Sequence, residues 1–272
     1  MFGEEIRKVT FAELDKALEE YKTKFSEILE KSKLLYSERK YAVDLLIQVD
    51  GYIHSLSNKP KELEKEMEVV ELKRQDFENE IEKLKKDWKK DWKKEEDALK
   101  TETRIAIATA FGTAAAGTSI TALSGAAATN VALAYFGTGA LALGGAGMAT
   151  SEAVLVALGP IGWAIAGVIL IGSGIMLDNK KKKEIEKQQK QVEQKIMTIK
   201  EGINELKKKE KRIIEETKST SSLNLGIGKV LADLKRNRKR NYRWFSKTEK
   251  EQLMQLMNAS NALSKRIGEK IS

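Results

Sequence analysis

The chain has 272 residues, a net charge of +9 at neutral pH and a pI near 9.3, which favours anionic partners such as phospholipid headgroups or nucleic acid. The absence of cysteine excludes disulfides and thiolate metal sites, and two prolines with 6% aromatic residues argue for long helices and against strand-rich folds. Charge and apolarity are segregated, because residues 105–177 contain a single charged residue, Glu152, in a chain that is 33% charged.

Residues 1–104 have the pattern of a coiled-coil hairpin. From Phe11 to Leu56, apolar residues recur at alternating spacings of four and three, which is the seam of a coiled coil. Ser32 and Arg39 interrupt this seam, and we expect them to weaken packing and to fix the register against a partner helix. Residues 58–60 predict a break, after which a second helix is expected to pair antiparallel with the first. Its seam is Leu63, Met67, Val70, Phe77, Ile81, Leu84 and Trp88.

The central segment, residues 105–177, is rich in glycine and alanine and is about 73 residues long. One membrane-spanning helix needs only about 20 apolar residues, so a single span cannot account for it. Residues 154–177 are the best individual span. Residues 105–128 are long enough to span when paired with another helix, and residues 130–149 are expected to connect the two.

Small residues within this segment recur four apart, a spacing that allows membrane helices to pack closely. Alanine-rich sequences also give such spacings by chance, and soluble helices use them too. The residues predicted to serve insertion and helix packing are Gly112, Gly117, Thr121, Gly125, Gly137, Gly139, Gly144, Gly145, Pro160, Gly162, Trp163 and Gly167.

Lysine clusters flank the segment on both sides, within residues 85–94 and 180–183. Positive flanks usually stay on the cytoplasmic side, so we expect an even number of crossings, in the simplest case an antiparallel pair of spans. Basic and tryptophan side chains are expected at the membrane surface, where tryptophan favours the headgroup region. They are Trp88, Trp92, Lys180, Lys181, Arg238, Arg240 and Trp244.

Two states of the hairpin remain open: inserted in lipid, or sheltered by the amphipathic helices and released on a trigger. Glu152 faces a pore, titrates on insertion or lies in a solvent-exposed hairpin turn, and the turn is favoured.

Residues 178–272 are predicted to complete the bundle. The same spacing resumes from Ile185 to Ile213, and a turn-rich break is expected at residues 218–222. A shorter helix, residues 223–234, and a basic loop, residues 237–245, should follow.

The last helix is predicted to begin at a capping box formed by Ser246 and Glu249. We expect it to dock on the bundle through one face. That face consists of Leu253, Leu256, Ser260, Leu263 and Ile267.

Catalytic chemistry finds no support in the sequence. Gly137, Gly139 and Ala142 match a dinucleotide fingerprint in outline, but the required preceding strand and following acidic residue are missing. His54 is the only histidine and stands near a helix end, where a surface role is expected. We therefore predict no enzyme activity, no cofactor and no metal.

The densest basic and aromatic stretch is residues 235–245, which suits an anionic bilayer surface, nucleic acid or plain solvent exposure. Lipid or solvent is favoured here, and nucleic acid is a disfavoured partner.

In its order of elements, the chain resembles the α-helical pore-forming proteins of the cytolysin A and haemolysin BL type. Residues 106–113 through 144–148 look like the glycine-zipper segments of bacterial membrane-active proteins. The resemblance implies an all-α fold, an elongated antiparallel helical bundle or coiled coil with a central Gly/Ala-rich hydrophobic hairpin. Its domains are residues 1–104, the N-terminal coiled-coil hairpin; 105–177, the membrane-active hairpin; and 178–272, the helices that complete the bundle.

The predicted function is membrane insertion, with pore formation or permeabilisation and a role as a toxin component. The alternative is a membrane-anchored coiled-coil scaffold that binds a protein partner without forming a pore. Expected partners are an anionic bilayer and copies of the chain or related helical subunits. We expect membrane association alongside a soluble form. Residues 1–10 show no cleavable secretory signal, so release after cytoplasmic synthesis would need another route.

Overall fold

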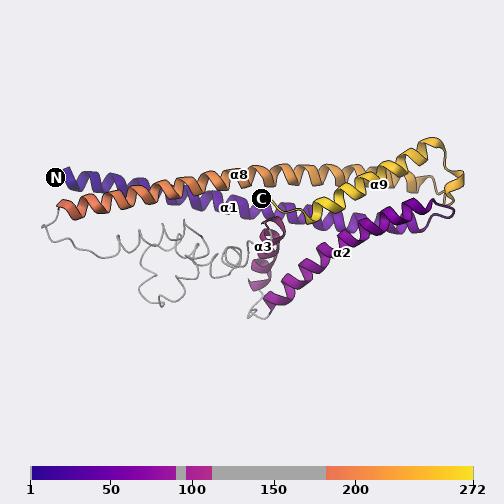
Figure 1. Cartoon of the computed structure of the whole chain (residues 1–272), viewed down its shortest axis with the longest axis horizontal. Helices are drawn as coiled ribbons and strands as arrows, with labels where there is room; N and C mark the ends of the chain where they lie inside the picture. Colours follow the sequence, from indigo (N-terminus) through magenta and orange to yellow (C-terminus); the bar gives the residue numbers. More distant parts are fainter. Residues whose placement is uncertain (1, 90–95, 112–181, 272) are drawn as a thin grey trace. The chain divides into compact units, whose positions relative to one another are not determined.

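The computed structural model describes residues 2–89, 96–111 and 182–271 (Figure 1). Within these residues the chain forms five α-helices and one 3-10 turn, and no described residue belongs to a β-strand. The elements are α1 (Phe2–His54), α2 (Lys61–Lys89), α3 (Glu96–Phe111), α8 (Lys182–Arg236), η3 (Tyr242–Trp244) and α9 (Lys247–Gly268). The all-α helical fold predicted from the sequence is therefore confirmed.

The chain divides into two compact units, and the two longest helices contribute to both. Unit 1 contains, among the described residues, 2–30 of α1, all of α3, and 182–211 of α8. Unit 2 contains residues 31–89 and 212–271, which include the rest of α1 and α8 together with α2, η3 and α9.

Unit 1 has an apolar interior. The seam residues Leu14 and Tyr21 of α1 and Ile199 and Ile203 of α8 are each at most 5% exposed. Two ion pairs join the helices, Lys207 to Glu20 at 2.9 Å and Lys24 to Glu210 at 3.3 Å. The partners lie 187 and 186 residues apart, and this near-constant separation means that α1 and α8 run parallel here.

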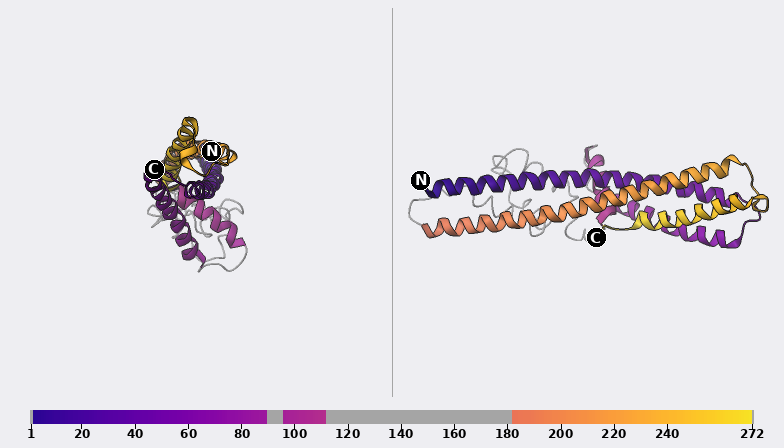
Figure 2. Two further views of the ribbon diagram at one scale, coloured as in Figure 1. Left: turned by 90° about the vertical axis from the view of Figure 1, so that its right-hand side faces the viewer. Right: turned by 90° about the horizontal axis from the view of Figure 1, so that it is seen from above.

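Unit 2 consists of two helical hairpins. The short turn at residues 55–60 joins α1 to α2, and residues 237–246 join α8 to α9. Each hairpin is antiparallel, as short helix connections require, and Figure 2 shows both turns at the same end of the unit.

The two hairpins of unit 2 lie side by side in the same direction. Asn224 donates to Glu38 Oε2 across 186 residues, Lys73 to Asn261 Oδ1 across 188, and Lys270 to Glu80 across 190. Helix α1 therefore runs parallel to α8, and α2 runs parallel to α9. The sequence predicted helix pairing but did not predict this parallel association of the hairpins.

The predicted seams form the core of unit 2. Leu35, Leu46, Ile53, Met67 and Phe77 are each at most 2% exposed. The side chains of Phe11, Trp88 and Ile185, which were also predicted for seams, lie outside the described side chains. Both seam interruptions, Ser32 and Arg39, are completely buried, so they lie in the core as the spacing predicts.

The predicted break at residues 218–222 is wrong, because α8 continues through it to Arg236. Serine and threonine have modest helix propensity, but tertiary packing outweighs such preferences. The Thr217 hydroxyl donates a hydrogen bond to Ile213 O at 2.7 Å within the helix. Thr220 and Asn224 are at most 2% exposed, which shows that this stretch packs into unit 2.

Among the described residues, no helix combines the length and the apolarity needed to cross a bilayer. The predicted spans at 154–177 and most of 105–128 lie outside the described residues.

Candidate functional site

A cluster of cations and aromatic side chains gathers at the turn end of unit 2, which we call the basic tip. It is built on residues 235–247, which close the hairpin of α8 and α9. Its cations are Lys235, Arg236, Arg238, Lys239, Arg240, Arg243 and Lys247. All of these except Lys239 are exposed to solvent, so the tip presents a concentrated positive surface.

Local backbone chemistry shapes the tip. Arg238 adopts a φ of 53°, the left-handed conformation in which helices commonly terminate, and it follows the end of α8. Asn241 then caps η3, accepting a hydrogen bond from the Arg243 amide at 3.0 Å. Ser246 and Glu249 form the predicted capping box at the start of α9, so that prediction is confirmed.

Glu249 is the acceptor that holds the tip together. Its carboxylate accepts from Lys239 Nζ at 2.8 Å, from Asn237 Nδ2 at 3.1 Å and from the Ser246 amide at 2.6 Å. The Lys239 side chain foremost, and then the Ser246 amide, lower the pKa of Glu249 from 4.5 to about 2. The sequence identified Glu249 only as a capping residue and did not reveal its contacts with Lys239 and Asn237.

The turn between α1 and α2 supports the tip from the other hairpin. The Ser57 amide donates to Arg240 O at 2.7 Å, and the Tyr242 amide donates to Ser57 O at 2.9 Å, forming a short parallel bridge. Arg240 also donates to Ser55 Oγ at 2.7 Å. Because backbone and side chain both take part, the two turns form one ordered surface.

The aromatic residues of the tip have different exposures. Phe245 is 6% exposed and packs against Tyr242, with ring centroids 5.8 Å apart. Lys250 lies over the Tyr242 ring at 5.1 Å, a cation–π distance. Trp244 is 70% exposed on η3. Trp244 therefore points into solvent from a turn that is anchored by the packing of its neighbours Tyr242 and Phe245.

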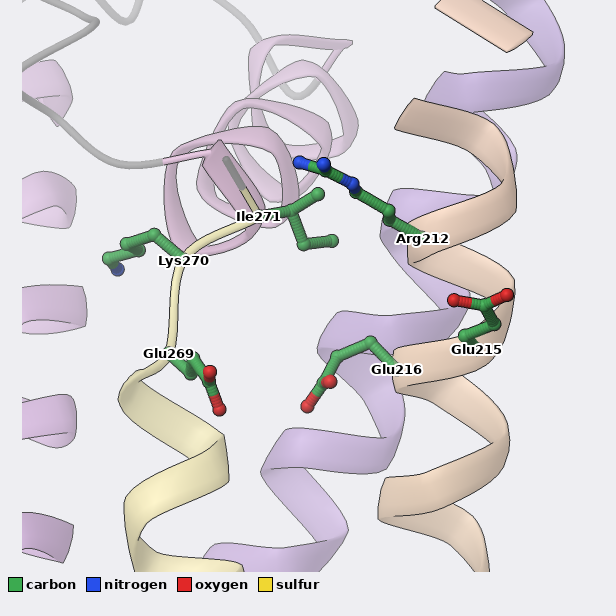
Figure 3. A pocket seen from close by; sticks show the side chains of 6 residues that line it. All are labelled: Arg212, Glu215, Glu216, Glu269, Lys270 and Ile271. Atoms are coloured by element: carbon green, nitrogen blue, oxygen red, sulfur yellow. The ribbon is translucent and has the colours of Figure 1, made fainter. Parts of the chain in front are cut away.

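A second cluster of charges lies in unit 2 where α9 ends against α8. A pocket of about 190 Å³ is lined by Arg212, Glu215, Glu216, Glu269, Lys270 and Ile271. Figure 3 shows Glu216 and Glu269 entering it from α8 and from the segment after α9, while Lys270 points away. That lysine bonds Glu80 of α2 at 2.8 Å, and Arg266 bonds Glu216 Oε2 at 2.7 Å.

Arg39 lies at the centre of this second cluster, which we call the buried charge layer. It is fully buried and donates from Nη2 to Glu269 O at 2.6 Å. Burial lowers the pKa of Arg39 to about 10, while the charges of Glu216, Glu80 and Glu269 oppose that effect. Arg39 is therefore a cation at neutral pH, and the layer links all four helices of unit 2.

The structure brings together three of the residues predicted for the membrane surface. Arg238, Arg240 and Trp244 all belong to the basic tip. Trp88 lies in the last turn of α2, where its side chain is not described, and His54 is exposed at the end of α1 beside Asp50, as expected. The other predicted site residues, Trp92, Lys180, Lys181 and the small residues from Gly112 to Gly167, lie outside the described residues.

Fold and site together define a helical bundle with a basic, tryptophan-bearing end. Comparison with known proteins gives no relative: the chain matches no protein-family model, no curated protein and no solved structure.

Proposed function

We propose that this protein inserts the apolar segment 105–177 into a membrane, in the manner of a pore-forming or permeabilising helical protein. The observation that carries the proposal is the segment itself, about 73 residues with Glu152 as its single charged residue. Two spans fit within that length, and its small residues favour close helix packing in lipid.

The described start of this segment supports a sheltered form before insertion. Residues 105–110 of α3 are each at most 2% exposed, so this stretch is covered around its whole circumference in unit 1. A helix that is apolar on all sides is typical of a protein interior or a membrane. The ring centroid of Phe111, the next residue, lies 5.4 Å from Lys209 Nζ of α8. Insertion then requires the segment to leave this environment.

Membrane insertion is tested with liposomes containing anionic lipid. We expect the protein to float with the vesicles after alkaline carbonate extraction and to release an encapsulated dye. Ile165→Arg places a charge near the middle of the best span, at a cost of about 3 kcal/mol, and should abolish carbonate-resistant binding. Leu72→Arg is the matched control, since Leu72 is 61% exposed on α2. Equal insertion by both variants would reject the proposal.

The second candidate, a membrane-anchored scaffold that binds a protein partner, is favoured by exposed apolar side chains in unit 2. Leu34 and Tyr41, one heptad apart on α1, are 56% and 53% exposed, and Leu225 of α8 is 73% exposed. Carbonate-resistant insertion without dye release would favour this scaffold over a pore.

A further inference from the structure

We propose that the basic tip docks on the surface of an anionic bilayer, with Trp244 entering the headgroup region. This inference rests on the proposed function in that it supplies the first contact with the membrane that the apolar segment enters. The partner it names is an anionic phospholipid surface.

The first step of the argument concerns which cations the fold itself uses. Lys239 is held by Glu249, and Arg240 by Ser55, so these two shape the tip. Arg238 and Arg243 are exposed, and their side chains make no hydrogen bond or ion pair with a described residue. Arg236 lies 3.9 Å from Asp233, a distance at which an exposed pair is weak.

The second step concerns charge balance. Residues 235–247 contain no acidic residue, and the acidic groups that pair with their cations are Asp233, 3.9 Å from Arg236, and Glu249, which is bound to Lys239. The tip therefore keeps an excess of positive charge that no part of its own structure neutralises. Basic residues close to an anionic leaflet each strengthen binding about fivefold, within a Debye length of the surface.

The third step concerns Trp244. Exposing most of a tryptophan to water is unfavourable, and the hydrogen bonds around η3 keep the side chain outside the core. Tryptophan is enriched at the boundary between lipid and water, where its apolar ring and its N–H group both find partners. A cationic surface with one exposed tryptophan has the chemistry of an interfacial membrane contact.

Nucleic acid is the competing partner, because phosphates also attract arginine and bases stack on aromatic rings. Sequence-tolerant single-strand binding uses successive aromatic side chains as stacking platforms. At the tip Trp244 is the exposed aromatic, whereas Phe245 is buried and Tyr242 is covered by Lys250. The tip of a chain that also carries a long apolar segment therefore fits lipid better.

The test compares two triple variants of the full chain. Arg236→Gln, Arg238→Gln and Arg243→Gln together neutralise tip cations that do not hold the turns in place. Lys83→Gln, Lys211→Gln and Lys218→Gln together remove the same charge from exposed positions on α2 and α8. Binding is measured by sedimentation with phosphatidylcholine vesicles, with and without phosphatidylglycerol, at low and at physiological salt.

We expect the tip variant to bind the anionic vesicles about a hundredfold more weakly than the wild type, from about fivefold for each cation. The control variant should lose at most a few-fold. Equal losses in both variants would show that net charge, not the tip, attracts the membrane, and would overturn the inference. Tighter binding of the wild type to single-stranded RNA than to anionic vesicles would overturn it too.

A second measurement locates Trp244 directly. The chain has no cysteine, so Trp244→Cys and, as control, the exposed Ser222→Cys each accept one environment-sensitive fluorophore. Anionic vesicles should shift the emission of the label at 244 to the blue and leave that at 222 unchanged. An unshifted label at 244 on a protein that sediments with the vesicles would contradict docking through the tip.

The proposals for the tip and for the inserting segment can be rejected independently of each other. Salt-sensitive binding lost in the tip variant, with no carbonate-resistant fraction in the wild type, supports the tip and rejects insertion. Carbonate-resistant insertion with equal binding by the tip variant and the wild type rejects the tip and leaves insertion standing.

Discussion

The basic tip and the buried charge layer are both rich in arginine, but the fold treats their charges differently. At the tip, Arg238 and Arg243 face solvent, whereas Lys239 and Arg240 are bound to Glu249 and Ser55. In the layer, Arg39 is fully buried and its neighbours Arg266 and Lys270 are each bonded to a carboxylate. A buried charge must be neutralised within the fold, whereas an exposed one remains able to bind a partner.

This difference assigns separate roles to the two regions. The layer joins α1, α2, α8 and α9 within unit 2, whereas the exposed cations of the tip present charge to the outside. Substitutions in the layer should therefore change stability, and substitutions of exposed tip residues should change binding.

The largest expected effect is that of Arg39→Ala. Removing one member of a buried charge network leaves carboxylates such as Glu216 and Glu269 without their central cation, so we expect a loss of about 3–5 kcal/mol in the free energy of unfolding. Urea denaturation followed by circular dichroism measures it. Arg39→Met, which keeps most of the volume, should cost less. A loss below about 1 kcal/mol for Arg39→Ala would mean that the layer does not hold unit 2 together.

Glu249→Gln tests the part of the tip that is structural. We expect a loss of about 1–2 kcal/mol at pH 7, because the capping box and the contact with Lys239 are weakened. The folded-state pKa of Glu249, about 2, lies below the ordinary 4.5, so its stabilisation is complete above about pH 4.5 and is lost as the pH falls towards 2.

The measurement is the pH dependence of unfolding from pH 7 to pH 2 for the wild type and for Glu249→Gln. The two curves should converge at the acid end. A constant gap between them over the whole range would show that ionisation of Glu249 contributes nothing.

Thr220→Val tests how a buried polar group without charge affects the stability of unit 2. Thr220 is fully buried, and its hydroxyl makes no hydrogen bond with a described residue. Valine has nearly the same shape without the polar atom, so we expect a gain of about 1 kcal/mol, seen as a higher urea midpoint. The exposed Thr248→Val should have almost no effect. A clear destabilisation by Thr220→Val would show that the hydroxyl is satisfied in solution.

The smallest expected effect on stability is that of Trp244→Ala. Because Trp244 is already 70% exposed, unfolding changes its environment little, so the free energy of unfolding should change by less than about 0.5 kcal/mol. Phe245→Ala, which truncates the buried neighbour, should cost about 3 kcal/mol. Comparable losses from both would place Trp244 in the fold and remove it from the exposed surface.

The sequence alone determined the helical class, the seams of the bundle and the capping box at Ser246. These follow from local periodicity and from short-range hydrogen bonding, so they are visible in a single chain. Arg39 was recognised as an interruption of a seam, but its surroundings were not, because Glu80, Glu216 and Glu269 lie far from it in sequence.

The tertiary structure decided what local patterns cannot encode. The continuous α8 overrides the turn-like residues 218–222, because the packing of Thr220 and Asn224 outweighs their weak helix preference. The parallel association of the two hairpins is likewise set by pairs such as Asn224 with Glu38. The tip also depends on the tertiary structure, because the bridge at Ser57 and the hydrogen bond from Arg240 to Ser55 join two turns that are far apart in the sequence, and such contacts follow no sequence spacing.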